Sequence, residues 1–221
     1  MATDNLTAAL RFYFISDDQA PTLSPCDQVR IALEAGATII QYRRKQFDLR
    51  FYDEALAIRR LCRKHAVPLI VNDHVLLAQA LSAEGVHLGQ TDEDPGLVRR
   101  ILGPRAIIGI SVSNLDELKH TDLTPCNYIG SGPVFPTTTK ADAKKVRRLS
   151  GLAEITRQAS LPVVAIGGVD PTNAAACFQH GAAGIAVISA ISRAPDPVRS
   201  ATKLGLVCRT AARQHPLRDG R

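Results

Sequence analysis

The sequence contains no tryptophan, and only 5% of its 221 residues are aromatic. No apolar run approaches the roughly 18 to 20 residues that a membrane-spanning helix needs, and the first ten residues, MATDNLTAAL, do not resemble a secretory signal. A long basic stripe interleaved with aromatic residues, which is typical of nucleic-acid binding, is also missing. These absences argue against a membrane protein, a secreted protein and a nucleic-acid-binding protein.

Cysteine is sparse and unpaired. The five cysteines form no CxxC pair, and no histidines stand near them at metal-ligand spacing, which argues against a zinc site. An odd number of thiols without a signal segment indicates reduced cysteines and a cytoplasmic protein. We expect these cysteines to act as small apolar residues of the core.

Lysine and arginine exceed aspartate and glutamate by 27 to 21, a net charge of +6. Residues 209–221 alone hold four arginines against one aspartate, and we expect a flexible basic tail from about residue 209. The remaining positive charge suits an anionic small molecule, so phosphorylated substrates are the first candidates.

Short apolar segments alternate with longer segments of helical period, the pattern of repeated strand-helix units. The expected strands are 12–16, 38–42, 69–72, 85–88, 106–111, 127–130, 163–167 and 184–189. The expected helices are 25–36, 49–65, 74–82, 95–103, 114–121, 150–159, 171–180 and 195–211. We interpret the basic residues 59–64 as a solvated helix end.

The strand segments are almost wholly apolar, which indicates parallel strands buried on both faces. Eight such units in 221 residues predict a single-domain (β/α)8 barrel spanning the whole chain. An open doubly wound sheet is the rival. Its GxGxxG fingerprint is absent, because the first strand runs into Ser16-Asp17-Asp18-Gln19, so the barrel is favoured.

Active sites of such barrels lie at the carboxyl ends of the strands, where this sequence is polar. After the second strand comes Gln41-Tyr42-Arg43-Arg44-Lys45, whose period of two sends Gln41, Arg43 and Lys45 to one side. An arginine fork and a lysine charge together favour a phosphate group. The alternative is a basic surface loop.

Two carboxylates, Asp73 and Asp92, follow the third and fourth strands. Carboxylates of adjacent strands can approach one Mg²⁺ ion, which takes its other ligands from water and substrate phosphate. The alternatives are a helix N-cap for Asp73 and a turn for Asp92.

Gly167-Gly168 ends the seventh strand and precedes the helix start Asp170-Pro171, and Ser189 ends the eighth strand. Loop amides at this place in a barrel commonly bind a phosphate monoester, although a plain turn would also explain the glycines. The loop 130–143 carries three threonines and Lys140, and we interpret it as a lid rather than an unstructured connection. We interpret His87, inside an apolar strand, as a core histidine.

The motifs QYRRK (41–45), ND (72–73), GVHLGQTD (85–92), GISVS (109–113), YIGSGPVFPTTTKADA (128–143), PVVAIGGV (162–169) and GIAVISAI (184–191) resemble the thiamine-phosphate synthase family over residues 12 to 191. The resemblance implies a barrel enzyme that joins hydroxymethylpyrimidine pyrophosphate to thiazole phosphate with Mg²⁺ and releases pyrophosphate. The pyrimidine carbocation forms first in that family, and the thiazole nitrogen then captures it.

The resemblance also implies a role for each matching residue. Arg43, Ser111 and Lys140 are the expected catalytic residues. The set implied for pyrimidine pyrophosphate is Gln41, Arg43, Lys45, Asn72, Ser111 and Lys140; for thiazole phosphate it is Thr137, Thr139, Gly168, Ile188 and Ser189; and for Mg²⁺ it is Asp73 and Asp92.

The chain departs from the family pattern at Arg44, often glutamate, at Ser113, usually histidine, and at Asn127, commonly aspartate, where we expect a structural effect at most. A thiazole phosphate tautomerase on the same barrel remains a rival, but Ser113 and the second polyanion site argue against it. A non-catalytic paralogue and a phosphate-binding barrel of amino-acid biosynthesis are further alternatives. A homo-oligomer is compatible with the sequence, which identifies no exposed patch.

Overall fold

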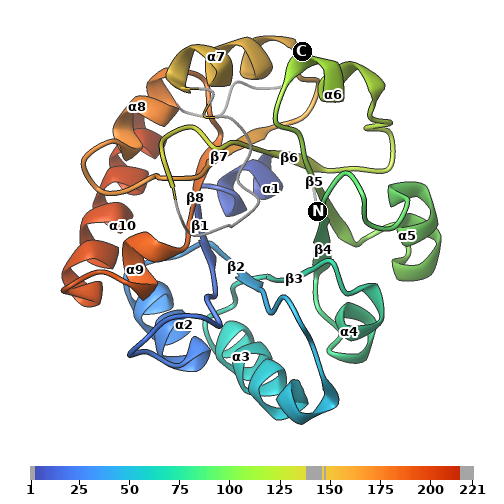
Figure 1. Ribbon diagram of the computed structural model, residues 1–221, viewed down its shortest axis with the longest axis vertical. Helices are drawn as coiled ribbons and strands as arrows, with labels where there is room; N and C mark the ends of the chain where they lie inside the picture. Colours follow the sequence, from blue (N-terminus) through green and yellow to red (C-terminus); the bar gives the residue numbers. More distant parts are fainter. Residues whose placement is uncertain (1–2, 138–145, 147, 215–221) are drawn as a thin grey trace.

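The computed structural model describes residues 3–137, 146 and 148–214, and in it eight parallel strands form a closed barrel (Figure 1). Each strand pairs with its neighbours in chain order, and the first pairs with the last. The strands are β1 (Phe12–Ile15), β2 (Ile39–Tyr42), β3 (Leu69–Asn72), β4 (Gly85–Leu88), β5 (Ile107–Ser111), β6 (Tyr128–Ser131), β7 (Val163–Ile166) and β8 (Gly184–Val187). The fold class expected from the sequence is confirmed.

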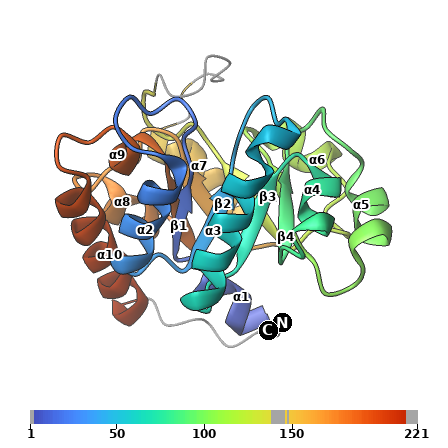
Figure 2. The same cartoon turned by 90° about the horizontal axis from the view of Figure 1, so that it is seen from below.

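Helices surround the barrel on all sides (Figures 1 and 2). They are α2 (Pro25–Glu34), the 3-10 turn η1 (Leu49–Phe51), α3 (Tyr52–Lys64), α4 (Val75–Ala80), α5 (Pro95–Leu102), α6 (Leu115–His120), α7 (Arg148–Gln158), α8 (Ala174–Gln179), α9 (Ser189–Ser192) and α10 (Pro197–Gln214). Within the described ranges, none of the helices combines the length and the apolar character needed to cross a lipid bilayer.

The period of two along each strand divides the core into two layers. In β1, Phe12 and Phe14 pack in the large cluster between the sheet and the helices. Tyr13 and Ile15 belong instead to the cluster that fills the barrel interior. Both faces of the strands are therefore buried, as the continuous apolar runs predict.

The helix α1 (Thr3–Ala9) is not among the elements expected from the sequence. Leu6, on this helix, and Leu10, just after it, belong to the apolar cluster of the barrel interior. In the side view α1 lies beneath the strands, opposite the end where the loops after the strands gather (Figure 2). It covers the amino-terminal end of the barrel, opposite the end at which the loops after the strands lie.

Three expectations about the helices need correction. Arg59 is not part of a solvated helix end: it is 5% exposed, and its Nη1 lies 2.7 Å from Oε2 of Glu84. The expected helix 171–180 begins only at Ala174, because residues 171–173 form a turn. Residues 209–214 continue α10 with Ala211 buried, so the part of the expected flexible tail that the structure describes is helical.

Candidate active site

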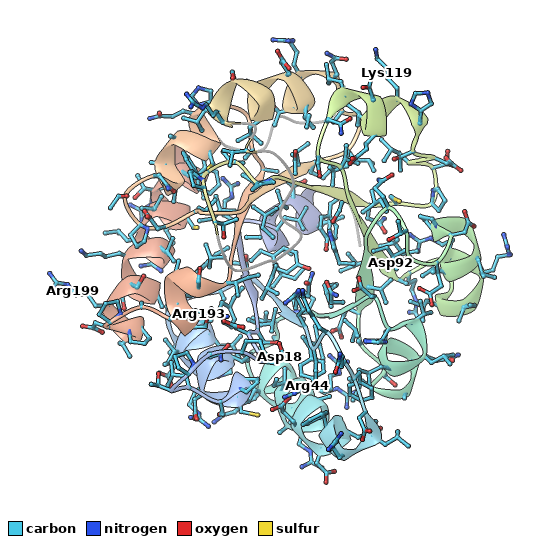
Figure 3. The ribbon with its side chains drawn as sticks, in the orientation of Figure 1. Asp18, Arg44, Asp92, Lys119, Arg193 and Arg199 are labelled. Atoms are coloured by element: carbon cyan, nitrogen blue, oxygen red, sulfur yellow. The ribbon has the colours of Figure 1, made fainter. Side chains whose placement is uncertain are left out.

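A cavity of about 460 Å³ opens at the carboxyl end of the strands. Its wall combines residues that follow seven of the eight strands, from β2 to β8. Figure 3 shows Asp92 and Arg193 on opposite sides of the barrel. The site residues expected from the sequence that line this cavity are Arg43, Lys45, Asn72, Asp73, Asp92, Ser111, Thr137, Gly168, Ile188 and Ser189.

One expected site residue lines another cavity, and two others lie outside the described residues. Gln41 lines a second, deeper cavity of about 40 Å³, where its Nε2 donates to the Tyr13 hydroxyl at 2.8 Å. Thr139 and Lys140 lie outside the described residues, as does the expected lid beyond Thr137. The two cavities share Asn72 and Ser111 in their walls, so the deeper one lies directly below the main one.

The end of β2 brings positive charge to the cavity. Arg43 is 7% exposed and lines the wall, and its backbone N–H donates to the Ser16 hydroxyl at 2.9 Å. Lys45, two residues on, also lines the wall. A guanidinium and an ammonium group on one wall can hold a polyanion from two directions.

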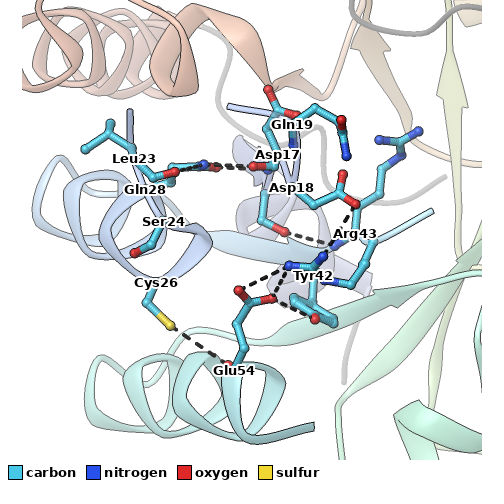
Figure 4. Close-up of polar contacts among 12 residues, drawn as sticks. Asp17, Asp18, Gln19, Leu23, Ser24, Cys26, Gln28, Tyr42, Arg43 and Glu54 are labelled. Atoms are coloured by element: carbon cyan, nitrogen blue, oxygen red, sulfur yellow. Dashed lines mark hydrogen bonds and ion pairs between the residues drawn. The ribbon is translucent and has the colours of Figure 1, made fainter. Parts of the chain in front are cut away.

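Arg44, between these two residues, is held outside the cavity, beside Asp18 (Figure 3). Its Nη2 lies 3.0 Å from Oε1 of Glu54, its Nη1 lies 3.9 Å from Oδ2 of Asp18, and its Cζ lies 3.6 Å from the centre of the Phe51 ring. The Tyr42 hydroxyl donates to the same Glu54 oxygen at 2.9 Å (Figure 4). These contacts anchor the basic strand end to α3.

We expect Arg44→Met to lower the free energy of unfolding by about 1–3 kcal/mol, because the shielded Glu54 carboxylate loses its charged partner. Arg30→Met is the matched control. Its pair with Asp27 is short, at 2.6 Å, but both side chains are about half exposed, at 51% and 45%. Such a pair contributes about 0–1 kcal/mol. Urea denaturation measures both values, and equal losses would contradict the anchoring role of Arg44.

The two expected metal ligands stand at the ends of adjacent strands. Asp73 takes a left-handed conformation, with φ of 62°, and its N–H donates to the His87 carbonyl at 2.9 Å. It is not a helix N-cap, since His74 occupies that position of α4. Asp92 does close a turn, because its Oδ2 accepts from the Gly89 N–H at 2.6 Å. Both carboxylates also line the cavity and can meet a cation there.

The opposite wall is built from backbone at the ends of β7 and β8. Gly168 has φ of 65°, and its carbonyl accepts from Nδ2 of Asn173 at 2.9 Å. After β8, the short helix α9 starts at Ser189, where the sequence analysis expected strand. The first N–H groups of a helix have no partners within it, so this wall can bind an anion through backbone groups.

The helix α9 is tied to the loop after β1. Oδ2 of Asp17, a residue 2% exposed, lies 2.7 Å from Nε of Arg193 and accepts from the Ser192 hydroxyl at 3.0 Å. Burial alone would raise the pKa of Asp17, but hydrogen bonds from Arg193, the Gln19 N–H and Ser192 lower this pKa below its ordinary value. The carboxylate therefore stays charged and holds the carboxyl end of α9, at Ser192 and Arg193, against the loop after β1.

The sequence analysis missed three interior residues. His87 is not a simple core histidine, because it lines both cavities. Tyr13 and Tyr128 lie in the wall of the deeper cavity. Their positions in β1 and β6 could have been read from the period of two, which sends both rings inward, but their contacts run across the barrel between distant strands.

Two departures from the family pattern also have clear positions. Ser113 lines the main cavity, and its N–H donates to Oε2 of Glu117 at 2.8 Å. Oδ1 of Asn127 accepts from the Ile108 N–H at 2.8 Å and from Nη2 of Arg99 at 2.7 Å, a structural role.

Known proteins resemble this chain in sequence and in fold. Residues 12–191 match the family model described as thiamine monophosphate synthase. A thiamine-phosphate synthase of Vibrio parahaemolyticus is 41% identical over 89% of this chain and 97% of its own, and one of Azorhizobium caulinodans is 44% identical over 85% and 89%. The structure of thiamine phosphate pyrophosphorylase from Pyrococcus furiosus superposes with a TM-score of 0.85 and 37% identity, over 93% of this chain and 98% of the other. The chain therefore belongs to the thiamine monophosphate synthase family of enzymes.

Proposed function

We propose that this chain joins hydroxymethylpyrimidine pyrophosphate to thiazole phosphate and releases thiamine phosphate and pyrophosphate. The observation that carries this proposal is one cavity with two different walls, each of which suits an anion. Arg43 and Lys45 lie with two carboxylates on the β2 to β4 side, whereas Gly168 and Ser189 present backbone on the β7 to β8 side. Two phosphorylated substrates that react in one site need two such walls, one for each phosphate-bearing group.

The wall of Arg43 and Lys45 suits the pyrophosphate. The guanidinium and the ammonium group neutralise the charge that grows on the leaving group, and Asn72 and Ser111 offer hydrogen bonds beside them. Gln41, which the family motif assigns to the same substrate, lies below this wall and lines the deeper cavity. Lys140, outside the described residues, is assigned by the family motif to the same pyrophosphate.

We assign Asp73 and Asp92 to Mg²⁺. Two carboxylates at adjacent strand ends are the oxygen donors this ion prefers, and within the described ranges no group of three or more acidic, histidine or cysteine side chains competes with them as a metal site. Two protein ligands are enough for Mg²⁺, because this ion takes its other ligands from water and substrate phosphate. When bound, Mg²⁺ would supply positive charge to the departing pyrophosphate.

The wall of Gly168, Ile188 and Ser189 suits the thiazole phosphate, and Thr137 and Thr139 complete the set that the motifs assign to it. In the reaction, the bond between the pyrimidine methylene carbon and the pyrophosphate oxygen breaks, and its electron pair leaves with pyrophosphate. The lone pair of the thiazole nitrogen then forms the new carbon-nitrogen bond. No protein nucleophile is needed, so the residues bind, orient and stabilise charge.

We expect Gly168→Ala to raise the KM for thiazole phosphate by roughly tenfold to a hundredfold, because a small displacement of a binding wall is costly. An added Cβ would lie 2.4 Å from the Pro136 carbonyl oxygen, in the loop that carries Thr137, and φ of 65° already disfavours alanine. The KM for pyrimidine pyrophosphate should change much less. Steady-state kinetics with each substrate varied in turn measures both values.

Gly103→Ala is the control. Gly103 also has a positive φ, of 84°, but an added Cβ meets nothing within 4 Å. This variant carries the backbone strain without the steric clash, so both KM values should stay unchanged. If Gly168→Ala weakened both substrates equally, it would indicate a general folding defect, and the assignment of this wall to thiazole phosphate would fail.

The test of the whole proposal is a chromatographic assay for thiamine phosphate. Purified protein, Mg²⁺ and both substrates are mixed, and each component is omitted in turn. We expect product only when all are present. Binding of thiazole phosphate without product would favour a tautomerase or a non-catalytic paralogue instead, although Ser113 offers no imidazole for tautomerase chemistry.

We also place the reaction in the cytoplasm. All five cysteines are free thiols, and four of them are buried. Burial raises the pKa of the Cys62 thiol to about 12 and that of Cys126 to about 11, so these thiols stay protonated and inert at neutral pH.

A further inference from the structure

A row of hydrogen bonds crosses the barrel interior from Gln41 to Ser111. Nε2 of Gln41 donates to the Tyr13 hydroxyl at 2.8 Å, and this hydroxyl lies 2.8 Å from that of Tyr128. The Tyr128 hydroxyl lies 3.0 Å from Nδ1 of His87, and Nε2 of His87 lies 2.9 Å from the Ser111 hydroxyl. The row therefore begins in the deeper cavity and ends on the wall of the main one.

The amide of Gln41 sets the direction of the first two bonds. An amide nitrogen can only donate, so the Tyr13 oxygen accepts from it. Tyr13 is 1% exposed, and within the described part of the chain its hydroxyl bonds only Gln41 and Tyr128. If Tyr128 donated to Tyr13, the Tyr13 proton would be buried without an acceptor. Tyr13 therefore donates to Tyr128.

The same direction passes on to the serine. Tyr128 is fully buried, accepts from Tyr13 and directs its own proton to Nδ1 of His87. A neutral imidazole that accepts at Nδ1 carries its proton on Nε2, which donates to the Ser111 oxygen. The Ser111 proton then points away from Nε2 of His87 and is available to an acceptor that enters the main cavity.

Two glycines keep the aromatic rings of this row in place. A Cβ at Gly109 would lie 2.1 Å from Cζ of Tyr128, and a Cβ at Gly130 would lie 2.9 Å from Cε1 of His87. The rings thus occupy the space that side chains on β5 and β6 would otherwise fill. Their close packing against the backbone limits other ring positions, so the row has a fixed geometry.

We propose that Tyr13, Tyr128 and His87 are positioning residues that hold the Ser111 hydroxyl as a hydrogen-bond donor to the departing pyrophosphate. This inference rests on the function proposed above. A donor already aimed at developing negative charge stabilises it without reorientation. If the hydrogen bonds ran in the opposite direction, the Ser111 hydroxyl would donate its proton to Nε2 of His87. The lone pairs of the serine oxygen would then face the anion and repel it.

The direction can be measured without substrates. Nitrogen-proton correlation spectra of ¹⁵N-histidine-labelled protein distinguish the two neutral tautomers, and the His87→Gln variant identifies the signals of His87. We expect the proton on Nε2. A proton on Nδ1 would overturn the proposal, whether or not the protein makes thiamine phosphate.

The effect on the reaction is tested by a double-mutant cycle. Removal of a donor to developing negative charge typically lowers kcat by about a hundredfold to a thousandfold. Tyr128→Phe leaves the Ser111 donor in place and disturbs only its orientation, so we expect it to lower kcat by roughly tenfold. In the Ser111→Ala background the same change should have almost no effect, because the row acts through this serine. An equal loss in both backgrounds would overturn the proposal.

Tyr52→Phe is the control, since Tyr52 lies on α3, outside the barrel interior, and its loss of a hydroxyl should leave kcat unchanged. If circular dichroism shows that Tyr128→Phe does not fold, Tyr13→Phe replaces it in the cycle. A wild-type protein that makes no thiamine phosphate would refute the proposed function, whereas the tautomer measurement would still decide the direction of the row.

Discussion

Replacing Arg43 by methionine should lower kcat/KM for pyrimidine pyrophosphate by roughly a factor of 10² to 10³. Arg43 is 7% exposed and lines the main cavity. In the variant, therefore, little water can take over the stabilisation of the negative charge on the departing pyrophosphate. Methionine keeps most of the side-chain volume and removes only the charge and the hydrogen bonds. Steady-state kinetics at saturating thiazole phosphate measures the effect.

Two further variants show whether the loss is specific to Arg43 and to the shape of its guanidinium. Arg43→Lys keeps the charge but loses the planar fork, so we expect an intermediate loss. Arg63→Met removes an arginine from the exposed end of α3 and should leave the kinetics unchanged. Near-normal turnover of Arg43→Met would mean that the pyrophosphate binds elsewhere in the cavity.

Removing Mg²⁺ with a chelator should lower the rate by about a hundredfold or more, because a bound cation contributes several kcal/mol to the stabilisation of charge in the transition state. Asp73→Asn and Asp92→Asn should raise the Mg²⁺ concentration that gives half the maximal rate. Asparagine keeps an oxygen acceptor, which matters at residue 92, where the carboxylate also holds the Gly89 N–H. Calorimetric titration with Mg²⁺ in the presence of pyrophosphate gives a reading independent of turnover.

Asp116→Asn, on the exposed face of α6, is the control for the loss of one negative charge. It should not change the Mg²⁺ requirement. Full activity of the wild-type protein in excess chelator would contradict the metal assignment outright. An unchanged requirement in both Asp73→Asn and Asp92→Asn would instead place the ion on other ligands.

All eight strands were predictable from sequence to within about two residues, because a parallel strand buried on both faces is a short apolar run with polar residues at its end. Two short helices, α1 and α9, were not. The helix α9 has only four residues, about one turn, and α1 has seven; each forms because of what it packs against. The burial of Arg59 also depends on a distant contact. Its partner Glu84 is separated from it in the chain by β3 and α4, so no local pattern indicates the ion pair.

The rim of the site was predictable in the same way. Parallel strand ends meet at one mouth, so Arg43, Asp73 and Ser189 had to come together once the barrel was assumed. The interior row was not predictable, because its bonds join β1, β2, β4, β5 and β6 across the barrel. Their partners follow from the register of the closed sheet, which no local pattern in the sequence encodes.

The contact between Asp17 and α9 sets an order of events during synthesis. Asp17 and Ser192 are 175 residues apart, and β1 can pair with β8 only when both have left the ribosome. A growing chain that already displays Arg43 and Asp73 still lacks the wall that includes Ser189. The wall that we assign to thiazole phosphate can therefore form only after β8 and α9 have been synthesised, later than the wall of Arg43 and Lys45.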